Sequence, residues 1–411
     1  MKINIVGAGI SGLVAAIQLE KAGFKPHIFE TSTAAGGRVK TEVDQGIAYD
    51  HGFQVLLEAY PLAQKYLDYP ALELQAFFPG ALVFKDNKRY TFGDPLRHPG
   101  FLWPIMTNPL ASLSDKIKVF LLSQRLKKTP ISEIFKRKEQ STLSYLQEKG
   151  FSSKIIEHFF RPFFSGIFLE TSLETSSRMF EFVFKMFAEG KASIPKRGIQ
   201  AISQQLLEQL KQTKIHYNTS VQKVDDKGIH VEGLPLIESD YTIIATQAAQ
   251  LVSGLKSQET TWKSCHCFYF EVPEKQIKNS IIGLVPGGKL INNLHLVQPI
   301  EKSKTNILSV TVVEAKGLSK KPLLQKVKEE LQTIFGPGEY PLKKHFHIPK
   351  ALPHLTNIQY EIDASETQLT EGIFLAGDLL LNGSLNAAMR SGELAAEAVM
   401  SKIDSNMLRI I

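Results

Sequence analysis

The chain has 411 residues, of which 43% are hydrophobic and 22% are charged, and its formal net charge is +7. It is long enough for two or three globular domains, and its two cysteines, Cys265 and Cys267, exclude a disulfide framework and, with only His266 between them, a metal site. The chain has no apolar run of membrane-spanning length, no signal-peptide pattern and no nucleic-acid-binding module, so we expect a cytoplasmic protein without a nucleic-acid partner.

A glycine-rich turn follows the first predicted strand. Residues 3–6 form a short apolar run, and residues 13–21 have the composition and periodicity of a helix. Between them lie Gly7, Gly9, Ile10, Ser11 and Gly12. In such a unit the first glycine makes a tight turn, the second lets the backbone approach a pyrophosphate, and the third lets the helix pack on the strand. The phosphates are expected at the helix N-terminus, where free N–H groups and the positive dipole end favour an anion.

The second predicted strand, residues 26–29, ends at Glu30, eighteen positions after Gly12. A carboxylate at this place can accept hydrogen bonds from both hydroxyls of a ribose. It also disfavours the 2′-phosphate of NADP. Because strand, turn, helix and acid are in register, the sequence predicts a dinucleotide-binding site.

A second glycine motif, Gly36, Gly37 and Arg38, follows Glu30 after five residues. This Glu-x5-Gly-Gly-Arg string resembles the flavin-binding signature of the amine oxidase, phytoene desaturase and protoporphyrinogen oxidase superfamily. The resemblance implies that the dinucleotide is FAD and that the glycine pair and the arginine lie against its pyrophosphate. A guanidinium can bind a phosphate through a bidentate fork, which is consistent with that role.

Residues 39–57 alternate as strands do and contain His51, Gly52 and Gln54. The resemblance implies that this segment runs beside the isoalloxazine ring of FAD, where a glycine allows close approach of the backbone. His51 and Gln54 are therefore candidates to face the flavin or the substrate. For His51 the alternative, a structural histidine satisfied by its neighbours, is the more common case.

Residues 59–190 are rich in aromatic residues, prolines and helical periodicity, and we expect here an inserted, mostly helical part of a substrate domain. Helices are expected at residues 114–128 and 141–149. Phenylalanines are concentrated in residues 151–188, where Arg161-Pro162 is expected to break one helix. Most of these phenylalanines are expected in the core, and the others would line an apolar cavity above the flavin, which favours a largely apolar substrate.

Residues 99–138 combine a loop containing Trp103 with a basic amphipathic helix. This pattern is typical of enzymes that rest on anionic lipid, so peripheral contact with the inner face of the membrane is one hypothesis. A helix that packs on the domain and exposes solvated lysines is the alternative, and it is the more common one.

Residues 191–255 return to the strand-rich pattern of the nucleotide-binding domain. Short strands are expected between residues 214 and 231, and an apolar strand at residues 242–245 would be buried in a parallel sheet. The segment resembles the middle FAD-domain segment of the same superfamily. That resemblance implies that the backbone of Val221 meets the adenine.

Residues 256–348 supply a second part of the substrate domain. Strands are expected at residues 265–272 and 307–313, and a helix is expected at residues 322–335. Strands that are interrupted and then resumed indicate two domains built from interleaved segments.

The candidate for a catalytic base or water-positioning group lies at the start of this part. Amine oxidases of the superfamily commonly hold a lysine near the flavin N5 through a water, on a strand that would correspond to residues 262–270. Lys263 is the only lysine in that run, and an alignment without gaps places His266 about as well. Both are candidates, and we transfer no amine-oxidase mechanism.

Residues 349–411 carry the third flavin signature. An apolar strand ends in Gly377-Asp378, and Ser384, Asn386 and Ala387 open the final helix. The resemblance implies that Asp378 holds the ribityl chain. The helix N-terminus would face the N1 and O2 edge of the ring and stabilise the anionic reduced flavin. No cysteine lies near this segment, so FAD is expected to be non-covalent.

The predicted fold class is α/β, with a Rossmann-like FAD/NAD(P)-binding domain and an interleaved α+β substrate domain. The first would be built from residues 1–58, 191–255 and 349–411, and the second from residues 59–190 and 256–348. Only one glycine fingerprint is present, so we expect no second nucleotide domain that would deliver electrons from NAD(P)H. The substrate would therefore give a hydride to flavin N5, and oxygen or a quinone would accept the electrons.

Three kinds of function stay open on the sequence alone. The first is FAD-dependent dehydrogenation of an isoprenoid-like or porphyrinogen-like molecule, with amine oxidation as its alternative. The second is a non-redox flavoprotein resembling UDP-galactopyranose mutase, which would need an arginine-lined pocket. The third is a binding protein that holds FAD only structurally.

Overall fold

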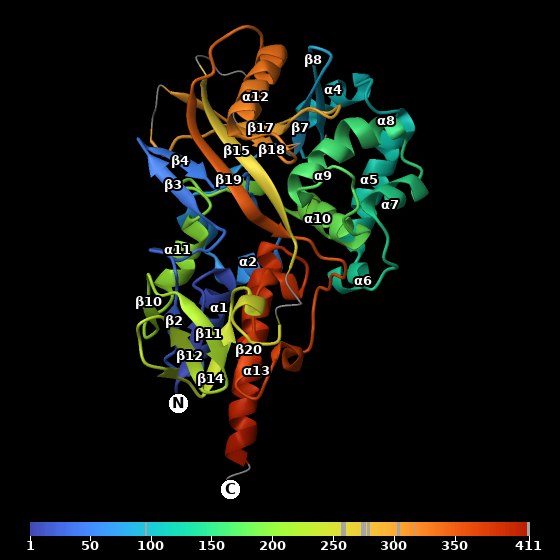
Figure 1. Ribbon diagram of the computed structural model, residues 1–411. Coiled ribbons are helices and arrows are strands. Elements are labelled where there is room, and N and C mark those ends of the chain that lie inside the picture. The colour runs from blue at the N-terminus through green and yellow to red at the C-terminus, as the bar shows by residue number, and fades with distance from the viewer. Residues whose placement is uncertain are drawn as a thin grey trace.

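The computed structural model has two halves, each organised around a sheet (Figure 1). It describes residues 1–408 apart from 95–96, 256–259, 273–276, 278–279, 302–304 and 316. In Figure 1 a parallel sheet lies in the lower half of the molecule and a seven-stranded sheet in the upper half, with a group of helices to the right.

The parallel sheet has five strands in the order β10-β2-β1-β14-β20. Its strands are β1 (Ile3–Val6), β2 (His27–Phe29), β10 (Lys214–His216), β14 (Tyr241–Ile244) and β20 (Ile373–Leu375). All residues of β1 and β14 are buried, as the apolar runs predict for strands inside a parallel sheet. Helix α1 (Ile10–Lys21) begins three residues before the predicted start and packs against α13 (Leu385–Leu408).

The second sheet is mixed and has the order β19-β15-β18-β17-β16-β7-β8. Its strands are β7 (Gly80–Lys85), β8 (Lys88–Gly93), β15 (Trp262–Val272), β16 (Ile282–Leu284), β17 (Ile291–Val297), β18 (Asn306–Val312) and β19 (Leu342–Pro353). Helix α12 (Lys320–Phe335) covers one face with Leu323, Val327 and Leu331. The predicted strands and helix of residues 256–348 therefore lie in one layered unit.

The helical insert follows β8. Its helices are α4 (Leu102–Thr107), α5 (Leu113–Lys128), α6 (Ile131–Phe135), α7 (Thr142–Glu148), α8 (Ser153–Ile155), α9 (Arg161–Phe168) and α10 (Ser177–Glu189). The predicted break at Arg161-Pro162 is wrong. A π-helical turn, Ile156–Phe160, joins α8 to α9 with right-handed helical dihedrals at both junctions, so the proline is absorbed in the first turn of α9. The predicted loop around Trp103 is also wrong, because that residue lies in α4.

Shorter strands form three small additional sheets in the described part of the chain. They are β3 (Thr41–Asp44) with β4 (Ile47–Asp50), β5 (Leu56–Leu57) with β6 (Gln75–Ala76) and β9 (Ala192–Ile194), and β11 (Val221–Asp225) with β12 (Gly228–Val231) and β13 (Ile237–Glu238). The remaining helices are α2 (Pro61–Tyr66), α3 (Tyr69–Leu72) and α11 (Ala201–Glu208).

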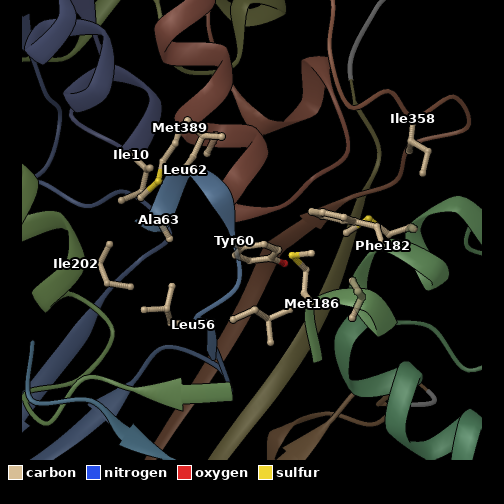
Figure 2. Close-up of a cluster of buried hydrophobic side chains, with 14 of the residues drawn as sticks. Ile10, Leu56, Tyr60, Leu62, Ala63, Phe182, Met186, Ile202, Ile358 and Met389 are labelled. Atoms are coloured by element: carbon tan, nitrogen blue, oxygen red, sulfur yellow. The ribbon is translucent and has the colours of Figure 1, made fainter. Parts of the chain in front are cut away.

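A single hydrophobic core continues from the nucleotide-binding half into the helical insert. Figure 2 shows its centre, where Ile10 of α1 and Met389 of α13 lie near Leu62 of α2. Further along, the ring of Tyr60 stacks on Phe182 of α10 with 5.6 Å between centroids. The same cluster includes Val83 of β7 and Leu284 of β16, so it also reaches the second sheet, most of which packs around a separate cluster.

The α/β fold class with parallel and mixed sheets is confirmed. The exact segment boundaries stay a prediction, and the predicted boundary at residue 256 lies outside the described residues. No helix in the described part of the chain has the length and apolar character needed to cross a bilayer.

Candidate active site

One large cavity lies where the parallel sheet meets the seven-stranded sheet and helices α9 and α10. Its volume is about 760 Å³, and its lining comes from both halves of the molecule. A small cavity beside Asp50 and His295 has a volume of about 30 Å³, which suits a water molecule rather than an organic ligand. The large cavity is therefore the candidate active site.

The glycine turn at one end of this cavity has the shape that an anion requires. Gly7 has a φ of +102°, which favours glycine. A Cβ on Gly12 would collide with the carbonyl oxygen of Gly7, whereas a Cβ on Gly9 would have no atom within 4 Å. Among the described residues no side chain caps α1 at Gly9, so the N–H groups of its first turn are available to a ligand. Ile10 and Ser11 of this turn line the cavity, whereas Gly12 serves the packing of α1.

Glu30 lies at the end of β2 and faces the same turn. Its carboxylate accepts hydrogen bonds from the backbone N–H of Ala8 at 2.7 Å and from the N–H and hydroxyl of Ser32 at 2.9 and 2.6 Å. These bonds fix the carboxylate at the cavity wall. This is the position that the sequence predicted for an acceptor of ribose hydroxyls.

The second glycine motif lies directly over the first. The N–H of Gly36 donates to the carbonyl oxygen of Ala8 at 2.9 Å, and Gly36 pairs with Gly9 as an isolated parallel bridge. A Cβ on Gly37 would lie 3.4 Å from the Cα of Gly9. The two motifs thus contact each other through backbone alone, and no side chain from Gly9, Gly36 or Gly37 enters the cavity that they line.

Arg38 and Asp378 come from signatures 340 positions apart and form an ion pair. The guanidinium also lies over the indole ring of Trp262, 5.2 Å from its centroid. The indole nitrogen Nε1 of Trp262 is buried and has no hydrogen-bond partner among the described residues. Gly377, Asp378 and Trp262 all line the cavity.

Of the remaining predicted cofactor residues, two line the cavity and two do not. Val221 and Ser384 line it. The hydroxyl of Ser384 accepts the N–H of Ala387 at 3.1 Å and so caps the first turn of α13. Asn386 and Ala387 are buried and do not line the cavity, and the side-chain oxygen of Asn386 accepts the N–H of Leu62 at 3.0 Å.

His51 and Gln54 both line the cavity. The Nε2 of His51 lies 3.2 Å from a carboxylate oxygen of Glu42, and its ring stacks on Phe346. Burial lowers the pKa of His51, and the hydrogen bond to Glu42 partly offsets this effect. Gln54 donates to the carbonyl oxygens of Arg38 and His51, each at 3.0 Å, which ties the histidine segment to the arginine motif.

Lys263 and His266 lie on opposite faces of β15. Lys263 lines the cavity, and its Nζ donates to the carbonyl oxygen of Phe168 at 2.9 Å and to the hydroxyl of Thr175 at 3.1 Å. Burial lowers the pKa of Lys263. His266 does not line the cavity and contacts His345 at 3.0 Å on the side of the sheet that α12 covers. Its pKa is lowered to about 4 by burial and by the neighbouring His347 and His345.

The other end of the cavity is apolar. It is lined by Phe163, Ile167 and Phe168 of α9 and by Met179, Val183 and Phe187 of α10. Phe164, Phe180 and Phe182 of these helices are fully buried in the core, as is Phe160 of the π-helical turn. Phe168 is equally buried and belongs to both the core and the cavity lining. The aromatic segment therefore serves both purposes that the sequence allowed.

Several polar lining residues were not singled out by the sequence analysis, among them Trp262, Asn293 and Thr311. Asn293 is buried, and its amide donates to the hydroxyl of Thr311 at 3.3 Å. The signal for Asn293 was available, because two consecutive asparagines interrupt an otherwise apolar strand. For Trp262 and Thr311 the sequence offered no comparable signal.

We call the end of the cavity at Gly9, Glu30 and Arg38 the nucleotide end, and its donors and acceptors fit a nucleotide cofactor. Gly9 meets open space beside an uncapped helix N-terminus, and Glu30 stands where ribose hydroxyls would lie. The unpartnered N–H of Trp262 offers a donor to an acceptor atom of a ligand. These features match the donor and acceptor groups of a flavin dinucleotide.

Comparison with known proteins agrees with this geometry. A family model described as flavin containing amine oxidoreductase matches residues 10–400. Protoporphyrinogen oxidase 2 of Arabidopsis thaliana is 27% identical over 167 residues, which cover 40% of this chain and 32% of that protein. The chain thus matches about a third of the length of this plant relative.

Two further comparisons extend over nearly the whole chain. Hydroxysqualene dehydroxylase of Zymomonas mobilis is 22% identical over 433 residues, which cover 97% of this chain and 99% of that protein. The crystal structure of an oxidoreductase from Methanosarcina mazei has a TM-score of 0.71 at 16% identity and covers 98% of this chain and 100% of that chain. At this identity the structural likeness shows a shared fold.

Proposed function

Since the chain belongs to the flavin containing amine oxidoreductase family, we propose that it is an FAD-dependent oxidoreductase that dehydrogenates a largely apolar small molecule. FAD bound here would supply the acceptor for the hydride that the substrate loses as a double bond forms. Oxygen or a quinone would then take the electrons. The proposed location is the cytoplasm, with contact at the inner face of the membrane through residues 99–138.

One observation carries this proposal. The same cavity that has Glu30 and the uncapped turn of α1 at one end has the apolar side chains of α9 and α10 at the other. A ligand with phosphate and ribose groups fits the first end, and an apolar molecule fits the second. The two would meet near Trp262 and Lys263, which lie on the strand between them.

The residues that would hold FAD follow from the contacts at the nucleotide end. Backbone N–H groups of Gly9, Ile10 and Ser11 would bind the pyrophosphate, and Glu30 would accept the ribose hydroxyls. Asp378 orients Arg38 through their ion pair. None of these contacts is covalent, and the two cysteines lie on β15, where burial raises the pKa of each thiol.

Lys263 is proposed as a positioning residue. Its two hydrogen bonds hold the C-terminal end of α9 and the loop at Thr175 against β15. Phe168, which closes the apolar end, is thereby fixed relative to the strand that carries Trp262. As a neutral amine, which its lowered pKa favours, Lys263 would accept the proton that the substrate loses together with the hydride.

The charges along the described lining argue against the two alternative substrates. The carboxylates among these residues are Glu30 and Asp378, both at the nucleotide end, so a cationic amine would find no carboxylate at the apolar end. The cationic side chains among them are Arg38 at the nucleotide end and the lysines Lys263 and Lys350. A UDP-galactopyranose mutase-like enzyme would need an arginine-lined pocket for its sugar diphosphate, and the described lining has one arginine.

The test is the visible spectrum of the purified protein before and after denaturation in acid, followed by anaerobic mixing with polyprenyl, porphyrinogen and amine candidates. We expect a yellow protein that releases FAD and bleaches with an apolar class of candidate. Bleaching with amines alone would establish amine oxidation instead. A colourless protein that cannot be reconstituted with FAD would overturn the proposal.

A further inference from the structure

Helix α5 has two apolar faces. Leu122 and Leu126 point inward and are buried. On the outward face, Leu113, Ile117, Phe120 and Leu121 have exposed fractions of 61%, 52%, 48% and 58%. These four follow the spacing i, i+4, i+7 and i+8, so they form one stripe. A helix that only packs on its domain needs a single apolar face.

Helix α4 extends this stripe. Trp103 is 77% exposed and Met106 is 54% exposed, and they lie one helical turn apart. The Nζ of Lys116 donates to the carbonyl oxygens of Met106 and Asn108, each at 3.2 Å, which holds the end of α4 beside the first turns of α5. We call the six side chains together the α4–α5 surface; they are Trp103, Met106, Leu113, Ile117, Phe120 and Leu121. Figure 1 places both helices on the outer side of the helical insert.

The segment that carries this surface is positively charged, although its Arg125 and Arg137 pair with Glu181 of α10. Residues 99–138 contain eight Lys and Arg and two Asp and Glu, so this tenth of the chain holds most of the net charge of +7. Lys127 and Lys128, at the C-terminal end of α5, are exposed, as are Lys136 and Lys138. One of the two acids, Asp115, is buried and accepts hydrogen bonds from Ser112 and Ser152.

We propose that the α4–α5 surface docks the protein on an anionic lipid bilayer. Large aliphatic side chains and a tryptophan at the surface of a soluble domain mark an interaction site when they are contiguous. An acidic bilayer matches both the apolar side chains and the positive charge of this surface. The apolar side chains can enter the boundary of the acyl chains while the lysines meet the headgroups. A purely apolar partner would leave the lysines without a counterpart.

The docking surface is attached to the wall of the cavity. On α10, Lys185 donates through Nζ to the carbonyl oxygens of Leu126 and Lys127 at 3.0 Å each, and Glu181 pairs with Arg125 of α5. Met179, Val183 and Phe187 of α10 line the apolar end of the cavity. Docking through α5 would therefore bring the apolar end within one helix of the lipid. This advantage for an apolar substrate rests on the proposed dehydrogenation, whereas the docking itself does not.

The first experiment is vesicle flotation of the full chain, without substrate. We expect binding to vesicles of phosphatidylcholine with phosphatidylglycerol and weak binding to phosphatidylcholine alone. The variant Ile117→Ser/Phe120→Ser/Leu121→Ser is expected to lose at least about tenfold in vesicle affinity. The matched control is Leu234→Ser/Leu236→Ser, which removes exposed leucines from the β12–β13 connection and is expected to bind as the parent does.

Two further measurements separate the contributions of the lysines and of Trp103 to vesicle binding. Lys127→Gln/Lys128→Gln is expected to lose about tenfold in affinity for the anionic vesicles. Added salt is expected to lower the affinity of the parent by the same factor. The chain has two tryptophans, so vesicles should shift the emission of the parent to the blue, and this shift should disappear in Trp103→Phe.

Unchanged vesicle binding in the triple variant, or no binding by the parent, would overturn the proposal. A parent that is dimeric in light scattering and a triple variant that is monomeric would also overturn it, because a second copy would then cover the surface. Thermal unfolding and flavin content should be unchanged in every exposed-residue variant. Since flotation requires no turnover, failure of the proposed function would not affect its result.

Discussion

The two ends of the cavity differ in how much of their wall is backbone and how much is side chain. At the nucleotide end the walls are backbone, because Gly7, Gly9 and Gly36 bring chain segments together without side chains. At the apolar end the walls are large side chains from α9 and α10, whose positions depend on the packing of the whole insert. The first end therefore tolerates few residue types, whereas the second can change its shape by substitution. A substitution on α9 or α10 can therefore change the shape of one end without altering the other.

The largest effect is expected at a backbone position. Gly12→Ala places a Cβ against the carbonyl oxygen of Gly7, and neither backbone can move without separating α1 from β1. We expect a loss of more than about 4 kcal/mol in the free energy of unfolding, or failure to fold. Gly9→Ala adds the same methyl group where no atom lies within 4 Å, so it should keep the fold.

Denaturant unfolding and flavin titration of these two variants test the contrast. Gly9→Ala should unfold as the parent does but bind FAD more weakly, since the methyl group would occupy the space of the phosphates. If Gly12→Ala were as stable as the parent, the close packing of α1 on β1 would not be a constraint on this position.

The second prediction applies the same comparison within the insert. Phe180→Ala removes a fully buried ring and is expected to cost about 3–5 kcal/mol of stability. Phe163 lines the cavity and is only partly buried, so Phe163→Ala should cost less stability and should weaken binding of an apolar probe. Thermal unfolding and titration with a fluorescent apolar ligand measure the two effects. Equal loss of stability in both variants would show that the lining ring is also a core residue.

The nucleotide end could be predicted from sequence because its chemistry lies in short-range motifs. A glycine turn between strand and helix, followed by Glu30, encodes its own geometry through local sterics. Gly36, Arg38 and Asp378 could be assigned by resemblance, and all three line the cavity. The ion pair between Arg38 and Asp378 could not be predicted, because it joins two distant signatures.

The apolar end could not be predicted residue by residue. Whether a phenylalanine fills the core or faces the cavity depends on the rotation of α9 and α10 within the insert, and this rotation is set by tertiary contacts. The sequence favoured Lys263 and His266 equally as candidates for the site. Their odd spacing places them on opposite faces of β15, and the structure shows which of the two faces lines the cavity. The π-helical turn before Arg161 could not be predicted either, because Pro162 predicts a break in the helix.

The third prediction concerns Asp50, a buried carboxylate that lines the small cavity beside His295. Its oxygen accepts the hydroxyl of Thr41 and the N–H of Ile199, yet burial raises its pKa to about 6. The raised pKa means that the folded protein holds the proton of Asp50 more tightly than the unfolded chain does. The contribution of this proton to the free energy of unfolding is complete at low pH and is lost as pH rises through 6. The loss is roughly 3 kcal/mol, from the rise above the ordinary value of 3.8.

Denaturant unfolding between about pH 4 and about pH 7 measures this effect as a difference between the parent and Asp50→Asn. The amide oxygen of asparagine can accept both hydrogen bonds, and its NH₂ group does not ionise. We expect the parent to lose stability relative to the variant as pH rises. A constant difference over this range would show that Asp50 is ionised in the folded protein throughout.

The smallest effect is expected at the Arg38–Asp378 pair, which brings side chains into the backbone-built end. The guanidinium is 40% exposed, so solvent screens the pair, and Asp378→Asn is expected to cost only about 1 kcal/mol of stability. It should weaken FAD binding about tenfold, because the variant no longer orients the guanidinium by charge. Glu157→Gln, which breaks an exposed pair with Arg161 outside the cavity lining, is the matched control and should leave FAD binding unchanged. Tighter FAD binding by Asp378→Asn would mean that the carboxylate competes with the cofactor for Arg38, and the nucleotide end would then depend on a side-chain exchange as well as on its backbone.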